Sequence, residues 1–212
     1  MILCYFVVME KGLLLLSGGF DSPVAGYLAK QKTDIVAVHF ASRPFYGIES
    51  EKKAADLAKK LGLKKLFIIN LGQAFKDIAQ KCNHKYYFVL SKRLMLKVGE
   101  VLAEKQKCSY IVTGENLGQV SSQTLSNLST ISLAVKIPVL RPLLNDDKDE
   151  IIVKAKEFGF YDIAVGPETC DFFGPKHPAT VSTNEQILLE EQKFDLNKII
   201  EMSMKNLEEV NL

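Results

Sequence analysis

The chain has 212 residues, of which 47% are hydrophobic and 25% are charged. Those proportions are typical of a soluble globular protein and exclude a disordered or fibrous chain. The length allows one compact domain with a substantial core. The formal net charge of +2 is too small to indicate a nucleic-acid partner by itself.

The four cysteines are Cys4, Cys82, Cys108 and Cys170, and they are widely spaced. No CxxC pair or Cys/His cluster has the spacing of zinc ligands. The apolar residues 2–9 are too short to span a membrane and lack the features of a signal peptide. We therefore expect a cytoplasmic protein with free thiols and no membrane contact. Cys4 and Cys108 are expected in the core, Cys108 within a strand, whereas Cys82 stays undecided.

Strand and helix patterns alternate along the first part of the chain. Residues 11–16 form an apolar run that is typical of a buried parallel strand. Ser22 as N-cap and Pro23 at the first helical position predict a helix to about Lys30. The next predicted elements are a strand, a helix that Gly62 ends and a strand, at 35–40, 49–61 and 66–69.

The same alternation continues in the second part. A long helix is predicted at 87–105 and a strand at 110–113, and another helix is expected to begin near 118–121. The remaining elements are an extended stretch at 138–144, a helix at 147–158 with Asp147 at its positive end and Gly159 past its last turn, and a charged helical tail from 184 to the C-terminus.

Repeated βα units predict an α/β fold with a parallel sheet between two layers of helices. Such sheets bind ligands at the carboxyl ends of their strands. No internal repeat or low-complexity linker divides the chain. We expect one domain over 1–180 and a C-terminal helical arm over 181–212.

Ser17-Gly18-Gly19-Phe20-Asp21-Ser22 stands where the first predicted strand turns into a helix. Successive glycines let the backbone approach a ligand with its N–H groups, and the helix adds its positive end. The hydroxyls of Ser17 and Ser22 can donate to phosphate, whereas Asp21 fits a phosphate site only with Mg²⁺ between them. The absence of a Walker lysine and of GxGxxG excludes a P-loop NTPase and a Rossmann site. The alternative is a turn that merely connects strand and helix.

Thr113-Gly-Glu-Asn-Leu-Gly-Gln-Val-Ser-Ser-Gln-Thr-Leu125 is a second distinctive stretch. It follows a predicted strand and is rich in hydrogen-bonding groups. We expect a second strand-end loop that faces the first across the sheet. A polar loop with a helix cap is the alternative.

Ser17 to Ser22 resembles the signature of the PP-loop family, which uses ATP to activate an oxygen as an adenylate and releases pyrophosphate. The stretch 113–125 resembles the PP-loop domain of the tRNA 4-thiouridine synthetases, also named thiamine-biosynthesis sulfurtransferases. Further matches follow in the same order, at 14–26, 39–40, 92–95, 140–143, 147–151, 167–170 and 175–178. The resemblance covers about residues 11–178 and implies the three-layer adenine nucleotide alpha hydrolase-like (PP-loop) fold.

The resemblance also implies ATP and Mg²⁺ as cofactors. Leu and Phe side chains can clamp the adenine, backbone groups of Leu16 and Phe40 can read its edge, and Lys92 can neutralise phosphate charge. For His39 a side-chain role and a histidine satisfied by backbone both stay open. Asp21 is the one candidate ligand for Mg²⁺. The implied ATP-binding residues are Leu15, Leu16, Ser17, Gly18, Gly19, Asp21, Ser22, His39, Phe40, Lys92, Gly114 and Gln123.

Cys170 lies in Pro167-Glu168-Thr169-Cys170, close in sequence to Lys176 and His177. A loop thiol beside cations can be partly thiolate at neutral pH. The resemblance implies that this cysteine carries persulfide sulfur, so Cys170 and Asp21 are the expected catalytic residues.

The expected enzyme is an ATP-dependent tRNA sulfurtransferase that adenylates uridine 8 at O4 and replaces the oxygen with persulfide sulfur to give 4-thiouridine. Sulfur transfer for thiamine thiazole synthesis is a further expectation. The alternatives are another PP-loop adenylating enzyme and a non-catalytic ATP- or RNA-binding subunit.

Two modules usual in the resembling family, an N-terminal THUMP module and a C-terminal rhodanese domain, find no match in the sequence. We therefore expect tRNA as a partner together with a separate THUMP-containing polypeptide or a homodimer. The sulfur donor is open between a cysteine desulfurase and a rhodanese-type protein. Some archaeal members of the resembling family carry a CxxC, linked to an iron–sulfur cluster, just before the motif that matches residues 92–95. Residues 88–91 carry no CxxC, so no such cluster is expected there.

Overall fold

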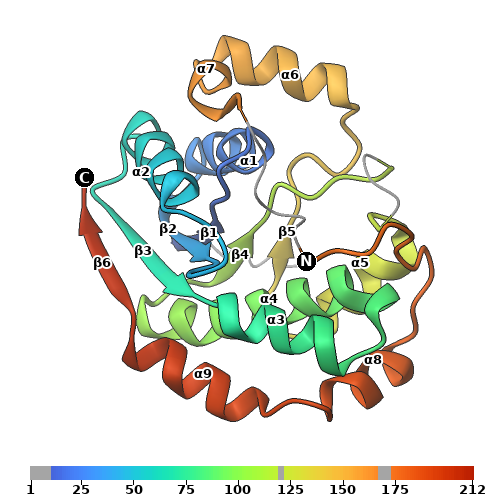
Figure 1. Cartoon of the computed structure of the whole chain (residues 1–212). Helices are drawn as coiled ribbons and strands as arrows, with labels where there is room; N and C mark the ends of the chain where they lie inside the picture. Colours follow the sequence, from blue (N-terminus) through green and yellow to red (C-terminus); the bar gives the residue numbers. More distant parts are fainter. Residues whose placement is uncertain (1–10, 119–121, 167–172) are drawn as a thin grey trace, which may run out of the picture.

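The computed structural model describes residues 11–118, 122–166 and 173–212. A mostly parallel sheet forms the centre of this structure, with strand order β5-β4-β1-β2-β3-β6 (Figure 1). The parallel strands are β1 (Lys11–Leu15), β2 (Asp34–Ala41), β3 (Lys65–Asn70), β4 (Tyr110–Val112) and β5 (Val139–Leu140).

Helices cover both faces of the sheet, which gives three layers (Figure 1). One face carries α1 (Asp21–Lys30), α2 (Glu49–Lys60), α6 (Lys148–Glu157) and α7 (Tyr161–Ala164). The other face carries α3 (Gly72–Lys81), η1 (His84–Tyr86), α4 (Tyr87–Lys105), α5 (Leu125–Ser132), α8 (Asn184–Glu191) and α9 (Leu196–Lys205). The predicted three-layer α/β fold is confirmed.

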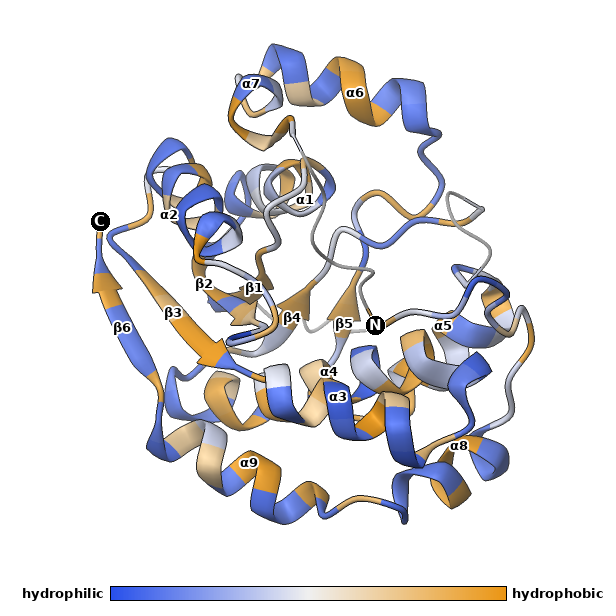
Figure 2. Ribbon diagram, in the orientation of Figure 1, coloured by the Kyte–Doolittle hydropathy of each residue, from blue (hydrophilic) through white to orange (hydrophobic). Residues whose placement is uncertain are grey.

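Two apolar cores lie on opposite faces of the sheet because successive residues of a strand point to opposite sides. Leu13 packs with the α4 face and Leu14 with the α1 face. Both side chains are fully buried. Figure 2 shows the hydrophobic strands at the centre and polar residues on the outer surfaces of the helices. This two-sided burial explains why the strands read as continuous apolar runs.

The C-terminal segment was predicted to be helical throughout, and this is wrong for its end. Glu208–Asn211 form β6, which pairs antiparallel with β3 at the edge of the sheet. An open β3 edge offers unpaired backbone groups, and β6 satisfies them. Ile187 and Phe194 of the same segment join the core that contains α4. The division of the chain at residue 180 stays a prediction.

Two predicted helix starts are wrong. Phe20, and not Ser22, is the N-cap of α1, because the Ser22 hydroxyl bonds within the preceding loop. The helix expected near 118–121 begins at Leu125, where the Thr124 side chain accepts from the Asn127 amide. Asp147 does cap α6, through a capping box with Glu150. Gly62 and Gly159 follow α2 and α6 with φ of 69° and 73°, as predicted for helix ends.

The sequence interpretation passed over α3 and α7. No helix in the described parts of the chain has the length and apolar character needed to cross a bilayer.

Candidate functional site

The sheet has a topological switch point between β1 and β4. The chain runs from β1 outward to β2 and β3 on one side and places β4 and β5 on the other. Ligands of open α/β sheets bind at such a point, outside the carboxyl ends of the strands. A cavity of about 380 Å³ lies there. All twelve predicted ATP-binding residues line it: Leu15, Leu16, Ser17, Gly18, Gly19, Asp21, Ser22, His39, Phe40, Lys92, Gly114 and Gln123.

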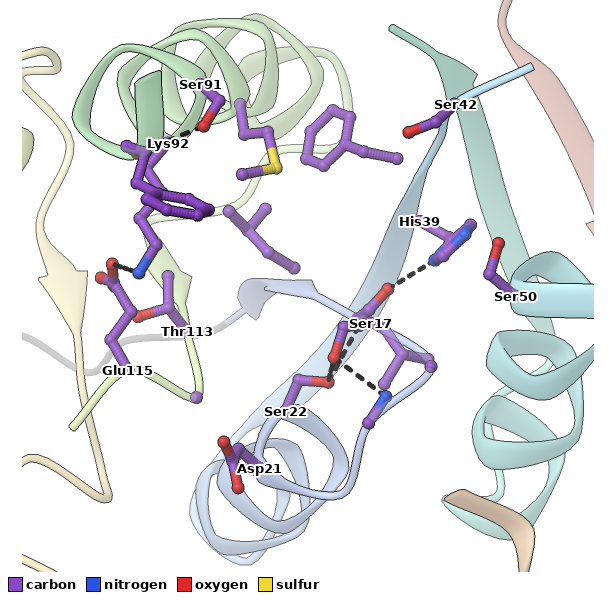
Figure 3. Close-up of a pocket in the computed structure, with 18 of the residues that line it drawn as sticks. Ser17, Asp21, Ser22, His39, Ser42, Ser50, Ser91, Lys92, Thr113 and Glu115 are labelled. Atoms are coloured by element: carbon purple, nitrogen blue, oxygen red, sulfur yellow. Dashed lines mark hydrogen bonds and ion pairs between the residues drawn. The ribbon is translucent and has the colours of Figure 1, made fainter. Parts of the chain in front are cut away.

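The loop between β1 and α1 is held by its two serines (Figure 3). The Ser17 amide donates to Ser22 Oγ over 2.9 Å, the two hydroxyls are 2.9 Å apart, and the Gly19 amide donates to Ser17 Oγ over 3.3 Å. Only one hydroxyl proton is used between the two serines, whichever of them donates. One O–H therefore remains for a ligand beside the N-terminus of α1.

Gly114 brings the second sequence motif against the first. A Cβ placed on Gly114 would lie 2.6 Å from the Ser22 amide nitrogen and 2.7 Å from the Asp21 carbonyl carbon. Only glycine permits this approach of two backbones. The turn after β4 is closed by Gln123, whose side chain accepts from the Asn116 amide and whose carbonyl accepts from the Gly118 amide. Residues 119–121 of the motif lie outside the described residues.

His39 is a buried neutral histidine. Its Nδ1 is 2.9 Å from the Leu16 carbonyl oxygen, so Nδ1 carries the proton and donates. Burial lowers the pKa of His39 and outweighs the opposite effect of that hydrogen bond. Nε2 is therefore an acceptor, and it is buried without a hydrogen-bond partner in the described chain. The ring lines the cavity, so the backbone bond and a ligand contact are compatible (Figure 3).

The backbones of Leu16 and Phe40 differ in what they can offer to a ligand. The Leu16 amide donates to the Val38 carbonyl and the Leu16 carbonyl accepts from His39, so the Leu16 N–H is already used. Phe40 lies two residues after Val38 and presents its backbone to the same side, past the end of β1. Phe40 is thus better placed than Leu16 to read the edge of a planar ligand.

Helix α4 presents one stripe of side chains to the cavity. Phe88, Lys92, Met95 and Leu96 line it, at the spacing of one helix face. Arg93 points elsewhere: it is 1% exposed and forms a two-point ion pair with Glu191 of α8, at 2.8 and 3.1 Å. The adjacent cations Lys92 and Arg93 therefore have separate roles: Lys92 faces the cavity, and Arg93 forms an ion pair in the core.

Glu115 links Lys92 to Arg141. Lys92 Nζ is 2.8 Å from Glu115 Oε1, and Arg141 Nε is 2.9 Å from Glu115 Oε2 (Figure 3 draws the first pair). Thr113 also donates to Glu115 Oε2. Burial would raise the pKa of Glu115, but Lys92 and Arg141 outweigh it and hold that pKa below its usual range. Glu115 is therefore an anion between two cations.

Aromatic side chains form another part of the wall. Phe173 packs edge-on against Phe45 with ring centroids 5.1 Å apart, and His84 Nε2 donates to the Phe173 carbonyl over 2.7 Å. A Cβ on Gly174 would lie 2.4 Å from the Phe88 ring, so the backbone of residue 174 lies against that ring. Phe173 and Ala164 both line the cavity.

The cysteines are distributed as follows. Cys170 and Cys4 lie outside the described residues. Cys82 is buried, and burial with the nearby Glu190 raises its pKa to about 11. Cys108 is only partly buried and precedes β4, so its predicted place within a strand is wrong. Burial raises the pKa of Cys108 as well. Neither described thiol has the properties of a reactive cysteine.

Four charged lining or supporting residues, Glu49, Lys53, Glu115 and Arg141, were not among the predicted site residues. Glu115 and Arg141 lie within motifs that the sequence analysis quoted, but their pairing depends on the strand order, which places β5 beside β4. Lys53 of α2 lines the cavity and donates to the Ala164 carbonyl. It stands among several lysines of an amphipathic helix, where nothing in the sequence marks it.

Known proteins with matching sequences identify the family. The family profile described as "Thiamine biosynthesis protein (ThiI)" matches residues 7–196. The chain belongs to this family. A probable tRNA sulfurtransferase of Alkaliphilus oremlandii is 42% identical over 93% of the chain, and one of Moorella thermoacetica is 39% identical over 95%. The chain spans about half the length of these relatives, 52% and 53%.

Solved structures agree with this ThiI-family assignment. A 4-thiouridine synthetase, in a crystal structure of its RNA complex with bound ATP, superposes with a TM-score of 0.90 at 38% identity. The match covers 95% of the chain and 55% of that protein. An NMN synthetase from Francisella tularensis shares the fold alone, with a TM-score of 0.59 at 14% identity over 94% of the chain and 85% of that protein.

Proposed function

We propose that the chain binds ATP in the cavity at the β1/β4 switch point and uses it to convert uridine 8 of tRNA to 4-thiouridine. The observation that carries this proposal is the contact of Gly114 with Ser22, which joins two sequence motifs in one site. The first motif is common to PP-loop enzymes, and the second resembles that of the 4-thiouridine synthetases. The relative with bound ATP and RNA supports the same nucleotide and the same class of acceptor.

The reaction needs ATP because the O4 oxygen of uracil is a poor leaving group. O4 attacks the α-phosphorus of ATP and pyrophosphate leaves. The terminal sulfur of a persulfide then attacks C4, and the C4–O bond breaks to release AMP. A second thiol must then cleave the S–S bond that still joins this sulfur to its carrier cysteine, forming a disulfide with that cysteine and leaving the sulfur on C4. Free sulfide would attack C4 without needing this last step. The enzyme holds both reactants together and stabilises charge on the phosphoryl group. Each of these effects is worth roughly 10³-fold in rate.

The cavity fits a nucleotide in several respects. Leu15 and Phe40 offer apolar surface for an adenine, and the Phe40 backbone can read its edge. The remaining serine hydroxyl and the N-terminus of α1 suit phosphate oxygens. Lys92 adds positive charge. His39 Nε2 can accept a hydrogen bond from an amino or hydroxyl group, but not from a bare phosphate.

Asp21 fits a role in holding Mg²⁺. It lines the cavity at the first residue of α1. The described residues contain no cluster of three or more His, Cys, Asp or Glu that could form a metal site of protein ligands alone. Mg²⁺ commonly uses one or two carboxylates together with substrate phosphates, so a single aspartate suffices. The ion would neutralise phosphate charge between Asp21 and the nucleotide.

Cys170 is proposed to carry the persulfide sulfur, from a cysteine desulfurase or a rhodanese-type donor. The described residues Ala164 and Phe173, which stand before and after it in the chain, line the cavity. A THUMP-containing partner, a homodimer and service to thiamine thiazole synthesis remain proposals drawn from the resemblance alone.

The test is a reconstituted reaction with unmodified tRNA, ATP, Mg²⁺ and a persulfide donor, with any THUMP-containing partner supplied. Mass spectrometry of the tRNA should detect 4-thiouridine at position 8, and pyrophosphate release should depend on tRNA. A different modified nucleoside would indicate another adenylating enzyme. ATP binding without tRNA-dependent pyrophosphate release would indicate a non-catalytic subunit.

A further inference from the structure

Arg141, Glu115 and Lys92 form a row of alternating charges that ends in the cavity. Arg141 follows β5 directly and Glu115 follows β4 after two residues, so neighbouring strand ends bring them together. Lys92 and Glu115 line the cavity, whereas Arg141 stands behind Glu115 and is not one of the described lining residues. The exposed fractions of the side chains are 10% for Arg141, 10% for Glu115 and 22% for Lys92.

Stability alone does not account for this row. Removing charges from water offsets most of what a buried ion pair contributes, and apolar residues often do as well. Arg141 also keeps a buried Nη2 without an acceptor in the described chain. A buried unsatisfied donor costs roughly 1–3 kcal/mol. The arrangement is therefore expected to serve the site.

The charges have an order that suits an anion site. Without Arg141, the Glu115 carboxylate would hold the Lys92 ammonium in place but would also cancel its positive charge toward a ligand. Arg141 Nε donates to the other oxygen of that carboxylate and Arg141 Nη1 donates to Ser132 Oγ, and these two hydrogen bonds fix the guanidinium in place. The three groups together carry one net positive charge, and the outermost charge is that of Lys92. Glu115 can thus hold Lys92 without making this row of charges neutral.

We propose that Glu115 and Arg141 are positioning residues that orient the Lys92 ammonium and set a net charge of +1 against the phosphates of the bound nucleotide. This inference rests on the proposed function only in taking ATP as the nucleotide. It does not depend on which base is modified.

The two positioning residues give opposite predictions for ATP binding. Arg141→Gln makes the row neutral and should weaken ATP binding about fivefold or more, the order expected for one unit charge in a partly buried site. Glu115→Gln raises the net charge to +2 and should leave ATP binding as tight as in the wild type or tighter. It should nevertheless lower the rate of pyrophosphate release, because Lys92 loses its anchor.

The experiment measures equilibrium binding of ATP, AMP and adenosine to the full chain by titration calorimetry. Circular dichroism and urea unfolding establish that each variant is folded. The change caused by Arg141→Gln should be largest for ATP, smaller for AMP and absent for adenosine. Lys65→Gln is the control for total charge, since Lys65 pairs with Glu209 on β6 and does not line the cavity.

The double variant Glu115→Gln/Arg141→Gln separates charge from structure. It restores the net charge of +1 through Lys92 alone, so ATP binding should recover most of what Arg141→Gln loses. A purely structural role predicts that the double variant is no better than the single one. Any of three results would overturn the proposal. The double variant could bind ATP no better than Arg141→Gln, or the two single variants could weaken ATP binding equally. The third is that Arg141→Gln changes adenosine binding by the same factor as ATP binding. Loss of 4-thiouridine formation with these binding results intact would count against the proposed function only, and a wild-type chain that does not bind ATP would overturn both.

Discussion

The backbone of Gly114 lies against Ser22, with room for no side-chain carbon between them. A Cβ at position 114 would be 2.6 Å from the Ser22 amide nitrogen and 2.8 Å from its Cα. The first turn of α1 and the turn after β4 thus form one continuous surface at the switch point of the sheet. The positions of the loop serines and of Glu115 relative to each other depend on this contact.

Gly114→Ala should therefore weaken ATP binding strongly while the fold survives. The added methyl group would push the turn after β4 away from α1, and overpacking of this kind costs about 1–3 kcal/mol. Calorimetric titration with ATP and urea unfolding would measure the two effects. Gly99→Ala is a matched control, because the nearest atom to its Cβ, Leu15 Cδ2, is at 3.4 Å. Equal ATP affinity in the Gly114 and Gly99 variants would contradict the role of the contact.

The βα alternation and the two motifs were sufficient to predict the parallel strands, most of the helices and twelve of the residues that line the site. The predicted helix at 87–105 has the bounds of α4. The start of α1 was mispredicted because a serine before a helix has two uses. Ser22 can cap the helix or tie the preceding loop, and the hydrogen bond from the Ser17 amide decides between them. The β6 strand has a charged sequence, and it forms because β3 offers a free edge.

The row of charges formed by Lys92, Glu115 and Arg141 could not be predicted from the sequence, for a different reason. Glu115 and Arg141 are 26 residues apart, and only the order of the strands places β5 beside β4. Strand order is a tertiary property that periodicity does not contain. Only the family resemblance distinguished Lys92 from Arg93 in the sequence. Periodicity did not, since adjacent helix positions point in different directions that only packing assigns.

His39 should contribute to a loss of stability at acidic pH. Its pKa is lowered in the folded state, so below about pH 6.5, the ordinary histidine value, the unfolded chain binds a proton that the folded chain does not. The free energy of unfolding should fall as the pH drops from there toward the folded pKa, by up to about 1.4 kcal/mol per pH unit from this group. Urea unfolding of the wild type and His39→Asn at pH 7.5, 6.5 and 5.5 would measure it.

The asparagine variant retains an N–H near the position of Nδ1 and does not titrate. The difference in stability between wild type and His39→Asn should therefore shrink or reverse as the pH falls. A difference that is constant over this pH range would show that His39 has an ordinary pKa in the fold.

Arg93→Met should destabilise the protein by about 3 kcal/mol, the low end of the range for a broken buried ion pair, because Glu191 loses its two-point partner and keeps only Lys97. Glu191 is 8% exposed, and its pKa is held low because Arg93 and Lys97 outweigh burial. The adjacent Lys92→Met removes a more exposed cation, and Glu115 keeps Arg141 as a partner. Urea unfolding and ATP titration on both variants should give opposite rankings: Arg93→Met costs more stability, and Lys92→Met costs more ATP affinity. The same ranking in both assays would refute the separation of roles along α4.

Cys170→Ser should abolish thiolation from a persulfide donor and leave ATP binding and tRNA-dependent pyrophosphate release intact. The physical reason is that serine cannot form a persulfide, whereas O4 activation requires no thiol. Cys82→Ala is the matched control: the Cys82 thiol is buried, its pKa is raised to about 11, and almost none of it is thiolate at neutral pH. Both variants would be assayed for pyrophosphate release and, by mass spectrometry, for 4-thiouridine and protein-bound persulfide. If a persulfide still forms on Cys170→Ser and is lost from Cys82→Ala, the sulfur is carried by Cys82 and not by Cys170. Full thiolation by Cys170→Ser would show that the reaction does not need Cys170.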